Sequence, residues 1–320
     1  MKDNLGRNID YMRISITDKC NLRCAYCMPE PREFIPHGEI LSYEEFLKIA
    51  EAAVKLGITK FKVTGGEPLV RKGAVGFIKR LKGLGGVENV TLTTNGILLG
   101  EYLDELADAG TDGINISLDA VSKDKYRNLT GDLYDFDPSI LERSIERNMK
   151  VKLNTVLLND NSDEWLKIIE IAEEIPVDIR FIELMPIGYA DTQDAPDANA
   201  LLKAAKAKYP DLEKTNDARG NGPAVYYKSE RLKGRIGIIG ANSHKFCSSC
   251  NRVRLTSTGM LKPCLSYDDG TDLKTPLRNG ADVSELTNIL ENAIKRKPHS
   301  HCFENADASN EKTAMHKIGG

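Results

Sequence analysis

The stretch DKCNLRCAYCMPE, residues 18–30, holds three cysteines in the spacing C-x3-C-x2-C. The thiols belong to Cys20, Cys24 and Cys27, which we call the first triplet, and the stretch contains no fourth cysteine and no histidine. Directly before it runs YMRISIT (11–17), an apolar segment of the kind that forms a strand. A loop with three metal-binding side chains therefore follows the first predicted strand.

Composition limits the classes of protein to which the chain can belong. Its 320 residues suffice for about two domains, and 41% hydrophobic with 28% charged residues is ordinary for a soluble globular protein. The net charge of −3 favours no nucleic acid partner, so an anion site needs a local basic cluster. No apolar stretch is long enough for a membrane span or a signal peptide core. We expect no membrane association and a cytoplasmic location.

Seven cysteines in such a protein favour metal or redox chemistry over disulfides. Three of them, Cys247, Cys250 and Cys264, form a second group, which we call the second triplet. Cys302 is left over, and we expect it to be an ordinary structural or surface thiol.

Strand-like and helix-like patterns alternate through the first 190 residues. The predicted strands cover 11–17, 58–66, 87–96, 111–119, 150–158 and 177–185, and the predicted helices 43–57, 101–110, 139–148 and 163–175. This alternation predicts parallel strands joined by crossover helices. Six units fall short of a complete TIM barrel, so we expect an α/β fold with an incomplete (β/α)6 barrel. A doubly wound sheet is the alternative.

Polar or unusual residues stand where almost every predicted strand ends. The first triplet follows the first strand, Thr-Gly-Gly-Glu-Pro (64–68) the second and Thr-Thr-Asn-Gly (93–96) the third. Ser117 and Asp119 mark the end of the fourth strand, and Glu-Leu-Met-Pro (183–186) that of the sixth. Active sites of parallel α/β folds lie at these carboxyl ends. We therefore expect a catalytic mouth there.

The pattern weakens beyond Ile187. We expect a linker at 191–200, a helix at 200–209, a loop at 215–224 and short strands at 224–229, 234–240 and 252–257. The predicted organisation is a barrel domain over residues 1–190 and a C-terminal domain over residues 191–320. The second domain would carry the second triplet and close the barrel mouth.

Two metals suit cysteines at these spacings. Structural zinc takes four ligands, so His37 or His244 would have to supply the missing one. A [4Fe–4S] cluster on three thiolates keeps one iron open, and an open iron can bind a small molecule. Zinc thus implies a non-catalytic module, and an open iron implies an enzyme.

The first triplet, with Tyr26 before its third cysteine, resembles the radical S-adenosylmethionine superfamily. The resemblance implies that a [4Fe–4S] cluster chelates S-adenosylmethionine, which an electron splits into methionine and a 5′-deoxyadenosyl radical. Residues 64–68 resemble the motif that meets the methionine amino group, and their glycines would let the backbone approach a ligand closely. By the same resemblance, Tyr26, Gly66, Ser117 and Met185 line the S-adenosylmethionine site.

The second triplet narrows the resemblance. FCSSCNRVRLTSTGMLKPCL (246–265) gives C-x2-C-x13-C, with Asn-Arg-Val-Arg directly after Cys250, and the sequence ends in Gly319 and Gly320. Together with Tyr-Cys-Met-Pro (26–29), these features resemble the GTP 3′,8-cyclase family, whose members catalyse the first step of molybdenum cofactor biosynthesis. The resemblance runs essentially end to end and is weakest from about 191 to 230.

This second resemblance implies a further [4Fe–4S] cluster on the second triplet, whose open iron meets the guanine of GTP. Arg252 and Arg254 would bind the nucleotide, since alternate residues of a strand share a face and two guanidinium groups suit a polyphosphate. Gly319 and Gly320 would enter the active site and be needed for cyclisation. Further GTP contacts implied by the family are Arg13, Lys62, Thr93, Lys152 and Arg180. Lys62 replaces the family's usual Arg, so a bidentate fork is lost there.

The predicted enzyme converts GTP to (8S)-3′,8-cyclo-7,8-dihydroguanosine 5′-triphosphate. By the resemblance, the deoxyadenosyl radical takes hydrogen from ribose C3′, and the sugar radical attacks guanine C8. The implied partners are an electron donor and the cyclic pyranopterin monophosphate synthase that takes the product, with a homodimer as one expected assembly. A peptide-maturing radical enzyme with an auxiliary cluster and a non-catalytic zinc-binding module are the alternatives.

Overall fold

The computed structural model describes residues 1–28, 33–131, 136–188, 190, 192–217, 219–303 and 311–319. Gly320 and the first residue of the predicted linker lie outside these ranges. Among the described helices, none has both the length and the apolar character that a membrane crossing requires.

All six predicted strands of the barrel are present. They are β1 (Tyr11–Ser15), β2 (Lys60–Thr64), β3 (Asn89–Thr94), β4 (Gly113–Ser117), β5 (Lys150–Leu157) and β6 (Asp178–Glu183). Each strand pairs in parallel with the next one along the chain. The predicted parallel α/β architecture is confirmed.

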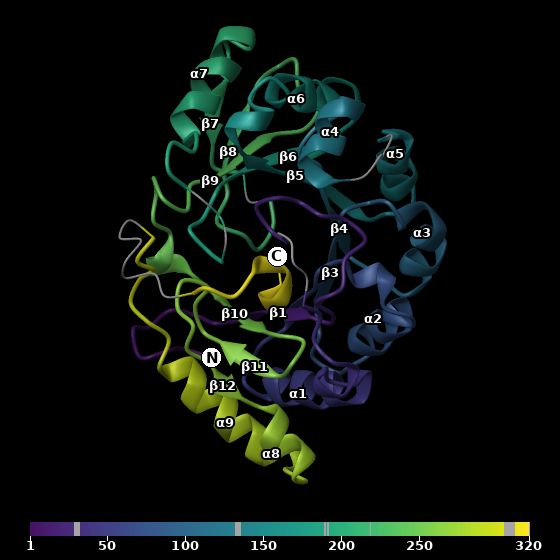
Figure 1. The fold of residues 1–320 in the computed structure, drawn as a ribbon, viewed down its shortest axis with the longest axis vertical. Helices are drawn as coiled ribbons and strands as arrows, with labels where there is room; N and C mark the ends of the chain where they lie inside the picture. The colour runs from purple at the N-terminus through teal and green to yellow at the C-terminus, as the bar shows by residue number, and fades with distance from the viewer. Residues whose placement is uncertain are drawn as a thin grey trace.

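Helices connect these strands on the outside of the sheet (Figure 1). They are α1 (Tyr43–Lys55), α2 (Ala74–Lys82), α3 (Leu99–Asp108), α4 (Lys123–Thr130), α5 (Ser139–Glu146) and α6 (Trp165–Glu174). A capping box starts α1, because the Ser42 hydroxyl accepts from the Glu45 amide while the Glu45 carboxylate accepts from the Ser42 amide. The sequence patterns predicted α1, α3, α5 and α6 but not α2 or α4.

Strands from the second half of the chain extend the same sheet at both edges. β10 (Arg252–Leu255) pairs in parallel with β1, and β9 (Ile236–Ile239) pairs in parallel with β6. Antiparallel strands continue outwards, namely β11 (Met260–Lys262) and β12 (Thr271–Asp272) beside β10, and β8 (Val225–Lys228) and β7 (Glu213–Thr215) beside β9. The strand order runs from β12 at one end to β7 at the other, which is an open sheet. This sheet crosses the predicted boundary at residue 190, and the division into two domains stays a prediction.

The remaining helices lie in the C-terminal half. They are α7 (Ala198–Lys208), α8 (Lys274–Arg278), α9 (Val283–Lys295) and α10 (Met315–Ile318). α7 begins within the predicted linker, because Asp197 caps it by accepting from the amide of Ala200. α9 packs against α1, where the Lys48 ammonium donates to the carbonyl of Ala281 at 2.6 Å. The C-terminal half is thus fastened to the first helix of the barrel.

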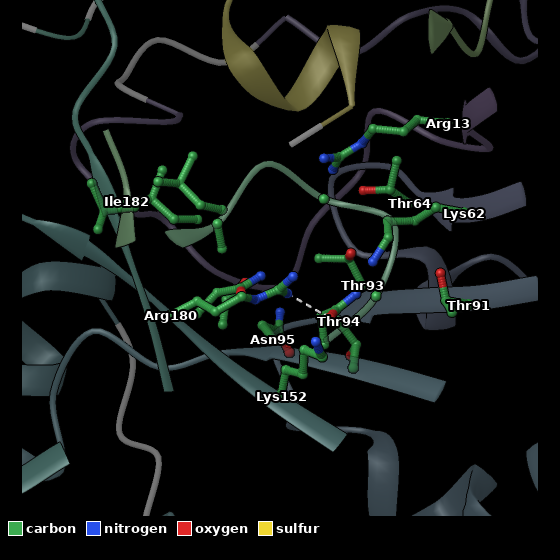
Figure 2. A pocket seen from close by; sticks show the side chains of 18 of the residues that line it. Arg13, Lys62, Thr64, Thr91, Thr93, Thr94, Asn95, Lys152, Arg180 and Ile182 are labelled. Carbon is green, nitrogen blue, oxygen red and sulfur yellow. Dashed lines mark hydrogen bonds between the residues drawn. The ribbon is translucent and has the colours of Figure 1, made fainter. Parts of the chain in front are cut away.

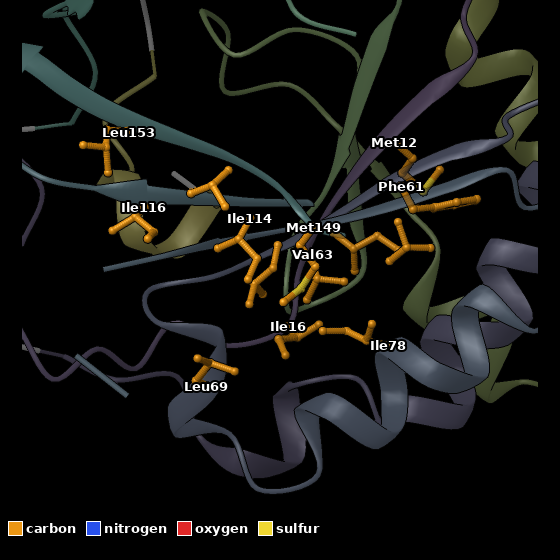
Figure 3. Packing of buried hydrophobic residues seen from close by; sticks show 14 of the residues in the cluster. Met12, Ile16, Phe61, Val63, Leu69, Ile78, Ile114, Ile116, Met149 and Leu153 are labelled. Atoms are coloured by element: carbon orange, nitrogen blue, oxygen red, sulfur yellow. The ribbon is translucent and has the colours of Figure 1, made fainter. Parts of the chain in front are cut away.

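Alternation along the parallel strands separates the core from the interior of the barrel. One face carries apolar side chains that pack under the helices, among them Met12, Phe61, Val63, Ile114, Ile116 and Leu153 (Figure 3). The residues between them, such as Arg13, Lys62 and Lys152, occupy the opposite face, since successive side chains of a strand alternate. The same pattern that builds the core therefore lines the interior with polar and cationic groups.

Candidate active site

A cavity of about 660 Å³ lies on the inner face of the parallel strands. Its lining includes all three cysteines of the first triplet. It also includes every residue that the sequence assigned to S-adenosylmethionine or GTP, namely Tyr26, Gly66, Ser117, Met185, Arg13, Lys62, Thr93, Lys152, Arg180, Arg252 and Arg254. Residues from both halves of the chain are thus gathered around one space.

Strand register aligns the cations of this cavity. Arg254 on β10 lies opposite Arg13 on β1, which lies opposite Lys62 on β2. On the other side, Lys152 of β5 is next to β6, which carries Arg180. Figure 2 shows the side chains of Arg13, Lys62, Lys152 and Arg180 directed toward one another from these strands. The interior of the barrel is therefore a concentration of positive charge.

The protein itself offers little counter-charge to part of this cluster. Lys62 is buried and has no ion-pair partner among the described residues. Burial, followed by the charges of Arg180 and Arg13, holds the pKa of Lys62 well below its ordinary value. Burial and the neighbouring Arg180 likewise lower the pKa of Lys152 to about 8. Crowded, desolvated cations of this kind are a site for an anionic ligand.

Neutral amides hold Arg180 in place. Its Nε donates to Oδ1 of Asn154 at 2.9 Å, and its Nη2 donates to Oδ1 of Asn115. Sequence reasoning missed both asparagines. Their positions were nevertheless predictable, because each is two residues along a strand from a predicted site residue, Lys152 or Ser117, and so shares its face.

Lys152 is held by residues from the second half of the chain. Its ammonium donates to the Tyr226 hydroxyl at 3.0 Å and to the carbonyl of Arg219, and lies 3.6 Å from the Asp178 carboxylate. Arg219 belongs to the loop between β7 and β8, where Asn221 reaches the start of β3. The sequence predicted only a loop here, since nothing in its composition points to a distant lysine.

The loop of the first triplet is fixed to the end of β4. Tyr26 donates from its hydroxyl to Oδ2 of Asp119 at 2.7 Å, and Oδ1 of Asp119 accepts from the amide of Val156 at 2.8 Å. Burial raises the pKa of Asp119 to about 6. The three thiols are half-buried and form no disulfide. They are therefore available as ligands beside the cavity.

The Thr-Gly-Gly-Glu-Pro loop braces the approach to this triplet. The Gly66 amide donates to the carbonyl of Thr17 at 2.8 Å, and the Glu67 amide donates to the carbonyl of Lys19 at 2.8 Å. A Cβ on Gly66 would lie 2.5 Å from the Lys19 carbonyl oxygen, so no side chain fits there. The absence of a side chain at Gly66, which we expected to allow a ligand to approach closely, thus also allows the close approach of the chain's own backbone.

Glu183, which ends β6, has a structural position. Its carboxylate accepts from the amides of Ala198, Asn242 and Ser243. It does not line the cavity. The polar residue at this strand end therefore joins segments of the second half rather than facing the predicted mouth.

The second triplet lies beside Arg252 but outside the lining of the cavity. Its thiols are also half-buried and free of disulfides. Burial raises the pKa of the Cys250 thiol, but the positive charges of Lys297 and Arg252 outweigh this effect and bring it to about 7. The neighbouring cations thus favour the thiolate form of Cys250, whereas burial raises the pKa of Cys264.

The surroundings of Lys297 show whether an anionic cluster fits the second triplet. Its side chain is buried, donates to the carbonyls of Arg252 and Pro263, and has no carboxylate partner in the described part of the chain. A buried ammonium without a counter-ion is costly. Thiolates that carry a cluster would supply the missing negative charge, so the residues present fit an iron–sulfur group.

The two histidines that the zinc alternative needs give it no support at the first triplet. His37 and His244 are both exposed, and neither lines the cavity of the first triplet. Within the described ranges, no three Cys, His, Asp or Glu side chains are arranged to hold a single metal ion. Cys302 bonds to the Ser266 hydroxyl at 3.1 Å, in keeping with the structural thiol expected from the sequence.

The C-terminal residues return to the ends of β1 and β2. Arg254 donates to the carbonyl of Gly319, whose φ is +85°. A Cβ on Gly319 would lie 3.0 Å from Cβ of Ser15 and 3.1 Å from Cγ2 of Thr64. The close contact of Gly319 with these two paired strand ends therefore suits glycine at this position. The predicted partner, Gly320, lies outside the described residues.

Two protein-family models match successive parts of the chain. The family model described as the Radical SAM superfamily matches residues 14–172, and that described as Molybdenum Cofactor Synthesis C matches residues 177–303. Among solved structures, Streptococcus suis SuiB bound to S-adenosylmethionine has a TM-score of 0.64 over 98% of this chain and 76% of its own. At 14% identity this likeness concerns the fold alone.

Curated relatives match along the whole chain. The GTP 3′,8-cyclase of Clostridium perfringens (strain 13) is 44% identical over 324 residues, and that of Desulforamulus reducens is 43% identical over 328 residues, each across 100% of both chains. The GTP 3′,8-cyclase of Thermodesulfovibrio yellowstonii is 42% identical over 93% of this chain and 94% of its own. With such identity from end to end, the chain belongs to the GTP 3′,8-cyclase family of radical S-adenosylmethionine enzymes.

Proposed function

We propose that the chain is a GTP 3′,8-cyclase, which uses S-adenosylmethionine and two [4Fe–4S] clusters to convert GTP to (8S)-3′,8-cyclo-7,8-dihydroguanosine 5′-triphosphate. One observation carries the proposal. The first triplet and a cluster of buried cations line the same cavity, so a radical source and a polyphosphate can be held side by side. Family membership names the reaction, and this geometry suits it.

The first triplet holds the cluster that binds S-adenosylmethionine. Three thiolates leave one iron open for the cofactor, and the cluster, when bound, supplies the electron that cleaves it to methionine and a 5′-deoxyadenosyl radical. Tyr26, Gly66, Ser117 and Met185 line the cavity beside the triplet, and there they would surround the cofactor. The bond between Tyr26 and Asp119 keeps the loop in a fixed position.

The cations orient the nucleotide. Arg13, Lys62 and Arg254 approach from β1, β2 and β10, and Lys152 and Arg180 approach from β5 and β6 across the same cavity. Guanidinium forks and ammonium groups together suit a triphosphate, whose charge relieves their mutual repulsion. Arg252 lies between the cavity and Cys250, so it directs the guanine end toward the second triplet.

The chemistry balances with two electrons and one proton from outside. The 5′-deoxyadenosyl radical that bound S-adenosylmethionine supplies would take one hydrogen atom from ribose C3′ and leave as 5′-deoxyadenosine. The C3′ radical forms a bond to guanine C8, and a second electron with a proton completes the product, an isomer of GTP. Both electrons come from an external low-potential donor. The role of the chain is to place C3′ near the radical source and to exclude water.

The remaining assignments extend this proposal. The enzyme works in the cytoplasm, draws on an electron donor, and passes its product to the cyclic pyranopterin monophosphate synthase. A barrel domain of residues 1–190 holds the radical source, and a C-terminal domain of residues 191–320 holds the second cluster. The tail that ends in Gly319 and Gly320 takes part in cyclisation, and a homodimer is a compatible assembly.

The experiment is anaerobic turnover of the reconstituted chain with S-adenosylmethionine, a reductant and GTP. We expect about eight iron atoms per chain, four for each cluster. We also expect 5′-deoxyadenosine together with a nucleotide isomer of GTP, and no such isomer of ATP in a parallel reaction. Stoichiometric zinc without iron, or 5′-deoxyadenosine without a GTP isomer, would reject the proposal.

A further inference from the structure

Residues 311–319, which we call the tail, are attached to the barrel at both ends. At the far end, Arg254 binds the carbonyl of Gly319. At the near end, the carboxylate of Glu311 lies 2.5 Å from the ammonium of Lys262, and both side chains are almost fully buried. No motif in the sequence singled out Glu311 or Lys262.

The near end is built around Glu311. Besides the ion pair, Oε1 of Glu311 accepts from the amide of Thr313 at 2.8 Å, and its carbonyl accepts from the amide of Gly188 at 3.0 Å. A Cβ on Gly188 would lie 2.9 Å from Cα of Ala314, so the two segments are in close backbone contact. Glu311 thus fixes both its own turn and the segment that follows β6.

The two cations that hold the tail are neighbours in the sheet. Lys262 of β11 lies directly opposite Arg254 of β10 in the antiparallel register. Side chains of such a pair lie on the same face of the sheet and within contact range of each other. Both ends of the tail are therefore anchored at the same place in the sheet. A shift of Glu311 would be transmitted to Gly319 through a segment of only a few residues.

A third contact lies between the two ends. Nδ1 of His316 on α10 is 3.2 Å from the carbonyl oxygen of Cys27 in the first triplet. Ile318 is buried in a small apolar cluster with Ile187, Ala241 and Phe303. The tail therefore passes over the loop of the first triplet before it reaches the ends of β1 and β2.

We propose that Lys262 and Glu311 are positioning residues for cyclisation, and that their ion pair sets where Gly319 enters the active site. A buried charge that loses its partner is strongly unfavourable, so Glu311 stays in place only while it is paired with Lys262. The inference rests on the proposed function in one respect, namely that the tail takes part in turnover of GTP.

A purely structural role is the competing explanation, and the two differ in what they leave intact. A structural pair would lower global stability and the loading of both clusters. A positioning pair would loosen the tail alone, so cleavage of S-adenosylmethionine continues while it becomes uncoupled from GTP conversion. The ratio of 5′-deoxyadenosine to cyclised nucleotide reports this difference.

The test is Glu311→Gln in the full-length, reconstituted chain, beside Glu291→Gln as a matched control. Glu291 pairs with Lys295 on the exposed surface of α9, and neither residue lines the described cavity. For Glu311→Gln we expect faster hydrogen–deuterium exchange in a peptide covering 311–319, normal iron content and a roughly tenfold or greater rise in the ratio of 5′-deoxyadenosine to product. The control should match the unmodified chain in all three.

A double variant in which the two charges are swapped controls for misfolding. Lys262→Glu combined with Glu311→Lys restores the pair in reverse, so it should bring back tail protection and part of the coupling lost in either single variant. Normal hydrogen–deuterium exchange together with normal coupling in Glu311→Gln would overturn the inference. A loss of iron in Glu311→Gln that the double variant does not restore would also overturn it. If the unmodified chain made no cyclised GTP, the proposed function would fail, whereas hydrogen exchange would still test the anchor.

Discussion

The guanidinium of Arg254 donates a hydrogen bond from Nη1 to the backbone carbonyl oxygen of Gly319, across 2.5 Å. Arg254 also lies opposite Arg13 in the parallel register, within the band of cations that lines the cavity. One side chain therefore joins the end of the chain to the proposed triphosphate site.

Gly319 is the sharpest steric test of the tail. Gly319→Ala places a methyl group about 3 Å from Ser15 and Thr64 at a positive φ, so the tail must shift. We expect product formation to fall by roughly tenfold or more, while iron content and circular dichroism are unchanged. Gly280→Ala is the control, because Gly280 also has positive φ but nothing within 4 Å of its Cβ position. Near-normal product after deletion of Gly319 and Gly320 would mean that the tail is dispensable.

Arg252 should matter for affinity. Arg252→Ala is expected to weaken GTP binding by about 1.5–3 kcal/mol, the usual scale for a hydrogen bond to a charged group. Binding should also weaken as salt concentration rises. Isothermal titration calorimetry checks both, with Arg80→Ala on the exposed surface of α2 as the control. Unchanged affinity in Arg252→Ala would assign Arg252 to a solvated strand face.

Lys152 predicts a pH dependence of GTP binding. Its pKa in the free protein is lowered to about 8, first by burial and then by Arg180, against the opposing effect of Asp178. The ammonium is present below this pKa and lost above it, and a triphosphate favours the charged form. GTP affinity should therefore fall as pH rises through about 8, and binding near that pH should take up protons.

Calorimetry in buffers of different ionisation enthalpy measures this proton uptake. Lys152→Arg should reduce the uptake, because arginine stays charged throughout the range. The other groups that face Lys152 are Lys62, Arg219 and Tyr226, and they are unchanged in this variant. A GTP affinity that is constant across this pH range would refute the assignment of Lys152 to the triphosphate.

Substitutions in the two triplets should impair different steps of the reaction. Cys24→Ser removes a proposed ligand of the first cluster and should abolish cleavage of S-adenosylmethionine, because no radical source would remain. Cys264→Ser affects the second cluster and should spare cleavage while preventing GTP conversion. Iron content, 5′-deoxyadenosine and cyclised nucleotide are measured in each variant. Equal loss of cleavage in two folded variants would contradict this division of roles.

The barrel strands were predictable because their signal is local. In β1 to β6, apolar residues such as Phe61 and Val63 alternate with polar ones, so each strand and its two faces follow from neighbouring residues. The positions of Asn115 and Asn154 follow from the same alternation. The parallel pairing follows from the alternation of strands with helices. The cations of the site were predictable for a second reason, the resemblance of the two triplets and their surroundings to a known family.

The rest depends on contacts between distant parts of the sequence. β9 and β10 read as short isolated strands, and nothing local shows that they extend the barrel sheet beside β6 and β1. The pairing of Lys262 with Glu311 brings together a strand and the tail, each of which looks ordinary by itself. Lys297 near Cys250 is likewise visible only after folding.

Transfer of hydrogen from the substrate tests the central claim most directly. The reconstituted chain would be given GTP that carries deuterium at ribose C3′, with S-adenosylmethionine and a reductant, and both products analysed by mass spectrometry. We predict that 5′-deoxyadenosine gains one deuterium and that the cyclised nucleotide loses it. Unlabelled 5′-deoxyadenosine formed alongside cyclised GTP would contradict the account, because the radical would then not act at C3′.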